Sequence, residues 1–94
     1  MNLRFTPQAL QDLRDIQEYL LPRSASGAEH VRLAIEYTVD LLAQFPGIAR
    51  NTDMENIRVI SVINYPYLVY HRLIKKEIEG IHIRHYRRSS FGRP

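Results

Sequence analysis

The sequence predicts an α+β fold in which two helices form an antiparallel hairpin that packs on one face of a β-sheet. Two long segments near the N-terminus repeat apolar residues at helical spacing, and a short strand-like segment precedes them. The second half of the chain changes to extended segments rich in β-branched and aromatic residues. With 94 residues and 45% hydrophobic residues, the chain can bury one core but not two. We therefore expect a single domain over residues 1–94.

The chain is expected to begin with a short strand that leads directly into a helix. Residues 2–5 form the strand-like segment, and Thr6 and Pro7 follow it. A threonine hydroxyl can accept a hydrogen bond from a free N–H of the first turn, and proline suits the first helical position because it has no N–H to leave unpaired. The helix should end at Pro22 and turn polar residues such as Asp12 away from the core. Its predicted apolar stripe consists of Leu10, Leu13, Ile16 and Leu20.

A second, longer helix is expected after a connector at residues 22–26. Ser26 and Glu29 stand three apart, the spacing at which each side chain can bond the other's backbone N–H at a helix start. The periodic segment ends at Pro46-Gly47, a pair that stops a helix. Two helices joined by so short a connector favour an antiparallel hairpin. The predicted apolar stripe of this helix consists of Val31, Ile35, Thr38 or Val39, Leu42 and Phe45.

After an irregular stretch, the pattern predicts a three-stranded antiparallel meander. The strands are expected at residues 57–63, 67–74 and 81–86, with turns at residues 64–66 and 75–80. A sheet of this kind buries one face against a covering layer. We therefore expect the helical hairpin to cover one face and the other face to be free to meet a partner.

Period-two alternation sorts the last predicted strand into two faces. Ile81 and Ile83 are expected in the core, and His85 falls on their face. Arg84 and Tyr86 fall on the opposite face. The last strand therefore places a basic and an aromatic side chain where a partner could reach them.

The excess positive charge is concentrated at the C-terminus. The chain carries 13 Lys and Arg against 10 Asp and Glu, a net charge of +3. Residues 1–80 hold nine of the cations and all ten acids, which gives −1, whereas residues 81–94 hold four Arg and no acid, which gives +4. A cationic cluster of this kind indicates an anionic partner, although a solubilising terminus has the same composition. We expect residues 87–94 to form a basic C-terminal tail.

Several classes of site are not expected. The chain has no cysteine, which excludes a disulfide framework and a thiolate zinc site. His82 and His85 stand three apart, which puts them on opposite faces of a strand, so we expect no metal site. The four glycines are scattered and form no phosphate-binding loop, so no cofactor is expected either. Without a signal-peptide pattern or a long apolar run, we expect a cytoplasmic protein that does not span a membrane.

A series of local motifs covers nearly the whole chain. In chain order they are Phe5-Thr6-Pro7 with Asp12-Leu13, Phe45-Pro46-Gly47, Ile57-Arg58, Tyr70-His71-Arg72, and Arg84-His85 with Arg87-Arg88. In this order and at this spacing, they resemble the RelE/ParE superfamily of toxins from bacterial type II toxin–antitoxin systems. The motifs around Arg58, the central hairpin and the Arg-rich terminus are closer to the ParE, or plasmid-stabilisation, branch.

The resemblance to the ParE branch implies a toxin that arrests growth by inhibiting DNA gyrase. It also implies neutralisation by a cognate antitoxin, and the cationic terminus leads us to expect an acidic one. The motif assigns no catalytic residue in this branch. The residues expected to meet the target or the antitoxin are Arg58, Arg72, Arg84, His85, Arg87 and Arg88.

The RelE branch implies a different activity, the cleavage of mRNA on the ribosome. In that hypothesis Arg58 and Arg84 stabilise the charge of the phosphate, and His85 or Tyr86 exchanges a proton, with histidine the better matched in pKa. The central hairpin departs from the nucleases, since it reads Tyr65-Pro66-Tyr67 where several of them carry an arginine. A third hypothesis is an inactive toxin that keeps the fold and only binds antitoxin.

Overall fold

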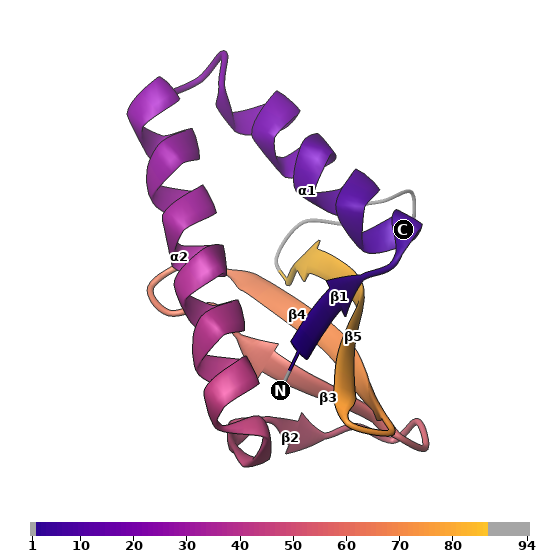
Figure 1. The fold of residues 1–94 in the computed structure, drawn as a ribbon. Coiled ribbons are helices and arrows are strands. Elements are labelled where there is room, and N and C mark those ends of the chain that lie inside the picture. Colours follow the sequence, from indigo (N-terminus) through magenta and orange to yellow (C-terminus); the bar gives the residue numbers. More distant parts are fainter. Residues whose placement is uncertain (1, 87–94) are drawn as a thin grey trace.

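Two helices pack on one face of a five-stranded mixed sheet in the computed structural model, which describes residues 2–86 (Figure 1). The strand order is β1-β5-β4-β3-β2, with β1 parallel to β5 and the other neighbours antiparallel. The predicted α+β class and the helical hairpin on one face are confirmed, whereas the sheet has more strands than predicted. The tail predicted at residues 87–94 lies outside the described residues. The elements are β1 (Asn2–Phe5), α1 (Pro7–Leu20), α2 (Ala25–Gln44), the one-turn helix η1 (Pro46–Ile48), β2 (Arg50–Asn51), β3 (Ile57–Ser61), β4 (Tyr67–Ile74) and β5 (Glu77–His85).

The sheet extends beyond the predicted meander at both edges. The N-terminal strand β1 joins it beside β5, and the short strand β2, which lies in the stretch expected to be irregular, pairs with β3. The strand β5 begins at Glu77 because the turn before it consists of only Lys75 and Lys76. Lys75 has a positive φ of 55°, which allows this tight reversal. The prediction that the turn extends to Gly80 is therefore wrong.

Gly80 lies inside β5 because the ring of Phe5 occupies the space that a side chain would need. A Cβ at this position would lie 2.7 Å from Cδ1 of Phe5, well inside van der Waals contact. The carbonyl of Gly80 also accepts a hydrogen bond from the N–H of Thr6 at 2.9 Å. The glycine that reads as a turn residue in the sequence thus permits a close approach between two strands.

A β-bulge interrupts the predicted alternation of β5. The pairing with β4 shifts between Tyr70 and His71, and Ile81 has no partner in the register. Ile83 is completely buried, as expected of a core residue, whereas Ile81 is only half-buried. The predicted core role is therefore confirmed for Ile83 and holds only in part for Ile81.

Helix α1 starts as the sequence predicts, and Leu13, Ile16 and Leu20 of its predicted stripe pack on the core. The Thr6 hydroxyl accepts a hydrogen bond from the N–H of Ala9 at 3.1 Å and donates one to the carbonyl of Ile81 at 3.0 Å. Two positions differ from the prediction. Asp12, predicted to face solvent, is completely buried, while Leu10 of the predicted apolar stripe is 45% exposed. The cause is the position of α1 beside β5, where a backbone N–H needs an acceptor.

Helix α2 starts two residues earlier than the predicted capping box. Ser24 has an extended backbone and caps the helix, accepting a hydrogen bond from the N–H of Gly27 at 2.9 Å. Ser26 already lies in the first turn and cannot be the cap, so the predicted pairing of Ser26 with Glu29 is wrong. At the other end of the stripe, Phe45 lies outside the helix and is 54% exposed.

The main core lies between the two helices and the centre of the sheet. Both helices contribute to it, together with strands β4 and β5 and the segment after β3. The helices join at one end and diverge toward the sheet (Figure 1). The buried members of this core are Ile16, Val31, Ile35, Val62, Tyr67, Val69 and Ile83.

Candidate functional site

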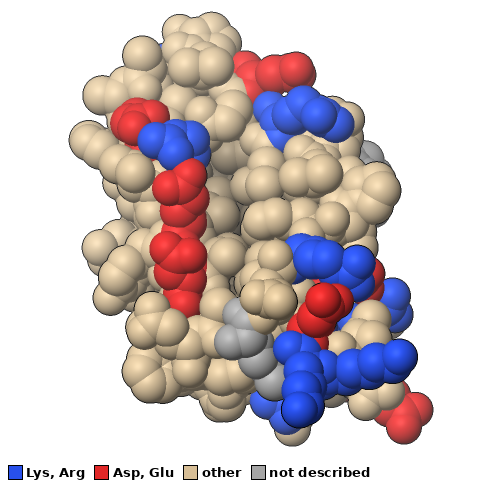
Figure 2. Space-filling model, viewed as in Figure 1, with Lys and Arg blue, Asp and Glu red and all other residues tan. Residues whose placement is uncertain are grey.

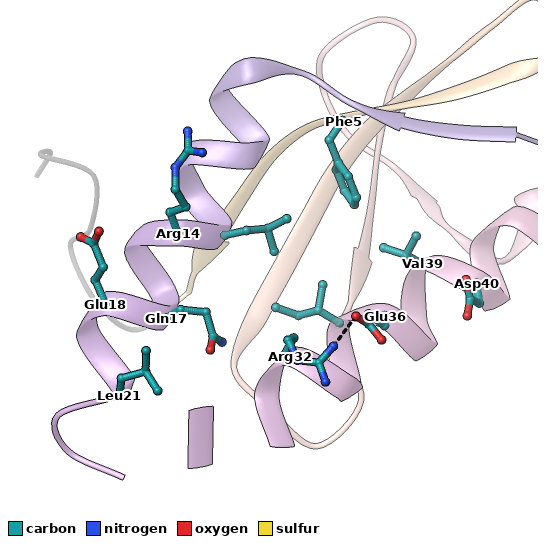
Figure 3. Close-up of a pocket in the computed structure, with 11 residues that line it drawn as sticks. Phe5, Arg14, Gln17, Glu18, Leu21, Arg32, Glu36, Val39 and Asp40 are labelled. Carbon is teal, nitrogen blue, oxygen red and sulfur yellow. Dashed lines mark hydrogen bonds and ion pairs between the residues drawn. The ribbon is translucent and has the colours of Figure 1, made fainter. Parts of the chain in front are cut away.

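A groove of about 570 Å³ lies between α1 and α2 (Figure 3). Leu13 and Leu21 line it from α1, Ile35 and Val39 line it from α2, and Phe5 of β1 closes it at the sheet. These side chains make the interior of the groove apolar. Its volume falls in the range of about 300–1,000 Å³ that is usual for binding pockets. The groove is therefore a candidate docking surface that the sequence pattern did not indicate.

Charged side chains line the rim of this groove. On α2, Arg32 donates to Glu29 at 2.6 Å and to Glu36 at 2.5 Å, and the second contact is drawn in Figure 3. The hydrogen bond from Arg32 lowers the pKa of the Glu29 carboxyl, so this acid stays ionised. Asp40 on α2 and Glu18 on α1 are exposed and form no ion pair with another residue of the described range 2–86.

A buried carboxylate joins α1 to β5. Asp12 is completely buried, and its Oδ2 accepts a hydrogen bond from the N–H of Ile83 at 2.8 Å. The same oxygen lies 2.7 Å from Nδ1 of His82, and Oδ1 accepts from Nε2 of Gln8 at 2.8 Å. Beyond the end of β1, Asp12 thus supplies the acceptor that another strand would otherwise give to β5.

The contact with Asp12 also orients a histidine. The side chain of His82 is 31% exposed and stacks on Tyr70, with ring centroids 6.2 Å apart and an interplanar angle of 29°. A carboxylate at Nδ1 fixes the orientation of the ring. Asp12 was not among the predicted site residues, although its spacing from Ala9 and Ile16 places it on the buried face of α1.

A buried histidine lies under the C-terminal end of α2. His71 is 3% exposed, and Nδ1 lies 3.2 Å from the carbonyl of Val69, which can only accept, so Nδ1 carries the proton. Nε2 has no hydrogen-bond partner. A small cavity of about 20 Å³ lies here, and Arg58 lines it together with His71. Burial lowers the pKa of His71, and the charge of Arg58 lowers it further.

Of the residues predicted for a ribonuclease, Arg58 lies apart from His85. Arg58 lies opposite His71 in the register and faces the helices, whereas His85 lies opposite Tyr67, four positions further along β4 and two strands away from β3. Strand geometry puts Arg58 and His85 about 15 Å apart. Arg84 is exposed on the opposite, outer face of the sheet, because the neighbouring residue in β5 points into the core.

The other predicted residues fall into separate surroundings. His85 is half-buried and meets the ring of Tyr67 edge-on, with centroids 5.1 Å apart, and Tyr86 is 51% exposed. Arg72 lies on the outer face and donates to Glu79 at 2.7 Å. The remaining two predicted contact residues, Arg87 and Arg88, lie outside the described residues.

Two kinds of feature are absent from the described part of the chain. Residues 2–86 contain no group of three or more His, Asp or Glu side chains placed to hold a metal ion. Neither α1 nor α2, the only helices of more than one turn in that range, has the length and hydropathy to cross a membrane.

Comparisons with known proteins agree with this architecture. The model of one protein family, the ParE toxin of the type II toxin–antitoxin system parDE, matches residues 3–89. The protein named "Putative toxin Y4kP" from Sinorhizobium fredii is 28% identical over 83 residues, which is 88% of this chain and 85% of that protein.

Solved structures of similar fold come from two toxin–antitoxin systems. A chain of the chromosomal ParDE system from P. aeruginosa superposes with a TM-score of 0.81 at 23% identity, covering 90% of this chain and 95% of that chain. The isolated E. coli RelE toxin superposes with a TM-score of 0.66 at 17% identity, covering 95% of this chain and 87% of its own. A chain of the intact E. coli RelBE complex gives 0.62 at 15% identity, covering 87% and 92%.

Proposed function

We propose that this chain, which belongs to the ParE toxin family of type II toxin–antitoxin systems, arrests bacterial growth by inhibiting DNA gyrase in the cytoplasm. The family match over residues 3–89 carries the proposal. The separation of Arg58 from His85, whose backbone positions lie about 15 Å apart by strand spacing, also supports it, because two groups that act on one phosphate must both reach it. In this proposal the toxin acts by binding and has no turnover of its own.

A cognate antitoxin is the second partner in the proposal. Solved relatives of the same fold come from a ParDE system and a RelBE toxin–antitoxin complex. The groove between α1 and α2 offers an apolar space of about 570 Å³ for a segment that folds on binding. The antitoxin would then hold the toxin through this groove while it masks the basic residues that meet gyrase.

A supercoiling assay with purified gyrase tests the proposed activity. We expect near-stoichiometric toxin to block supercoiling and the antitoxin encoded beside its gene to restore it. Replacing Arg84→Ala on the outer face should weaken the inhibition by roughly tenfold, the scale of one charge-assisted contact. Arg23→Ala is the matched control, since Arg23 lies in the connector and packs over the ring of Tyr19. Unimpaired supercoiling at an excess of toxin that still arrests growth would refute the proposal.

A ribonuclease remains the second candidate because of one arrangement on the sheet. His82 is oriented by the buried Asp12, and Arg84, two residues further along β5, shares the outer face with it. Primer extension on mRNA after induction tests this candidate. If cuts appear, His82→Ala should reduce them about 10²–10⁴-fold, the usual cost of losing a general acid or base. Loss of the cuts in His85→Ala but not in His82→Ala would return the assignment to His85.

A further inference from the structure

The two walls of the groove between α1 and α2 carry different charge. On α2, the charged residues that line the groove are the acids Glu36 and Asp40 and the cation Arg32, which leaves that wall at −1. Glu29, next to the groove on the same helix, also pairs with Arg32. On α1, the groove is lined by one cation and one acid, which cancel. Figure 2 shows the acidic side chains of α2 in a line along the helix. The α2 wall is therefore the acidic edge of the groove.

The one cation on this edge, Arg32, already pairs with carboxylates of its own helix. Arg32 makes hydrogen bonds to Glu29, three positions before it, and to Glu36, four positions after it. These contacts lower the pKa of Glu29 and raise that of Arg32, so both groups stay charged and matched to each other. Asp40 has no such partner among the described residues. An incoming chain therefore meets unbalanced negative charge at Glu36 and Asp40.

We propose that the groove selects a basic amphipathic helix of the antitoxin, with apolar anchors in the groove and Lys or Arg side chains along the α2 edge. This inference rests on the proposed neutralisation by an antitoxin and adds the chemistry of the segment that docks. The apolar side chains of Leu13, Ile35 and Val39 suit anchors at helical spacing. Carboxylates beside such anchors would meet the carboxylates of α2, whereas cations would pair with them.

The proposal changes the expected charge of the partner. The sequence alone indicates an acidic antitoxin, because the excess cations lie at the C-terminus. Basic side chains also gather toward the lower end of the molecule in Figure 2, with some acidic ones among them. The exposed β4–β5 turn contributes Lys75 and Lys76. An antitoxin complementary to the whole surface must then be bipolar, with a basic apolar segment for the groove and an acidic segment for the cationic regions.

Two synthetic peptides test the polarity directly. Both would be helical, about 18 residues long, with the same leucine stripe, and they would differ only in carrying Lys or Glu beside it. At low ionic strength, fluorescence anisotropy with the full-length toxin should show the Lys peptide binding about tenfold more tightly, the sum of two or three weak surface ion pairs. High salt should remove most of the difference.

Matched toxin variants assign the effect to the α2 edge. Asp40→Lys should weaken the Lys peptide about fivefold and strengthen the Glu peptide, as expected for one reversed surface charge. Asp15→Lys is the control, because Asp15 is an exposed helical aspartate that does not line the groove. Leu21→Glu, at a groove residue that is 53% exposed and so not needed for folding, should weaken both peptides.

Each outcome bears on the proposal separately from the toxin activity. Equal affinity for the two peptides, or tighter binding of the Glu peptide, would overturn the basic-helix assignment even if gyrase is inhibited. A toxin dimer that Leu21→Glu dissociates would overturn it as well, because a second copy would then be the occupant of the groove. A polarity effect that Asp40→Lys reverses supports the proposal even if the supercoiling assay fails.

Discussion

Two buried polar side chains, Asp12 and His71, differ in how completely their hydrogen bonds are satisfied. Asp12, on the seam between α1 and β5, is completely buried and has hydrogen-bond partners at both oxygens. His71, under the end of α2, is 3% exposed and has a partner only at Nδ1. Burying a polar group costs free energy unless its hydrogen bonds are replaced. Asp12 should therefore stabilise the native state, whereas His71 should lower its stability.

Burial alone does not determine whether a polar residue stabilises the fold. Removing Asp12 leaves the buried N–H of Ile83 without an acceptor. The loss of stability therefore includes the cost of burying that N–H unpaired. Removing His71 takes away only the hydrogen bond at the carbonyl of Val69, and it also removes the buried nitrogen that has no partner. The following variants test this contrast in the order of their expected effects.

The largest change in stability is expected at Asp12, on the seam between α1 and β5. Asp12→Ala should lower the free energy of unfolding by about 3 kcal/mol, because it removes a charge-assisted hydrogen bond and leaves the N–H of Ile83 buried without an acceptor. Urea denaturation followed by circular dichroism measures the change. Asp15→Ala on the same helix is exposed and should stay within about 0.5 kcal/mol of the wild type. Equal effects at the two aspartates would contradict the role given to the seam.

The next largest effect is expected where β1 and β5 approach each other, at Phe5 and Gly80. Gly80→Ala places a Cβ 2.7 Å from the ring of Phe5, which must shift into the groove. We expect a loss of about 2 kcal/mol in the free energy of unfolding, typical of overpacking. Gly47→Ala is the control, since nothing lies within 4 Å of the Cβ it would add. A Gly80→Ala variant as stable as this control would show that Phe5 moves without cost.

The pH dependence of stability should separate His71 from the rest of the core. Its pKa is lowered from the ordinary 6.5, so the unfolded chain takes up a proton below about pH 6.5 while the folded chain stays neutral. Stability is then lost as the pH falls, by up to about 1.4 kcal/mol per pH unit from this residue. Arg58 is the one charged group lining the His71 cavity, and the other lining residues, Leu42, Pro46, Leu73 and Ile78, are apolar.

His71→Leu is the variant that isolates this contribution. It keeps the other three histidines, so their titration cancels when its stability curve is compared with that of the wild type. We expect the variant to be at least as stable as the wild type at pH 7, because the unpaired Nε2 is gone, and to be less sensitive to acid between pH 6.5 and 5.5. Parallel curves over this range would mean that His71 takes up its proton equally in both states.

The smallest effect is expected for an ion pair on the outer face. Arg72→Ala removes the hydrogen bond to Glu79 and should cost only about 0.5 kcal/mol, less at high salt, because the guanidinium is half exposed. Lys76→Ala at the neighbouring turn is the matched control and should be neutral within error. A cost above that of Asp12→Ala would reverse the ranking of buried and surface polar contacts.

Much of the architecture was accessible from local patterns. The Thr6 cap, the two helices, the central strand and the covering of one sheet face were predicted, because each depends on residues a few positions apart. The cap at Ser24 was missed since Ser26 offers an equally good local signal, and the choice between them depends on the backbone path of the connector. The groove could not be predicted, because it arises from the divergence of two helices.

The sequence by itself determined the element types, the hairpin, the basic C-terminus and the family resemblance, since periodicity and composition are local properties of the chain. Only the tertiary structure decided that β1 lies parallel to β5, that Asp12 is buried against Ile83, and that His71 is left with one partner. The first two outcomes depend on residues more than 70 positions apart, as Asp12 and Ile83 are, and the third depends on the packing of α2 over β4. An aspartate on a helix has the same local pattern whether water or a strand edge lies beside it.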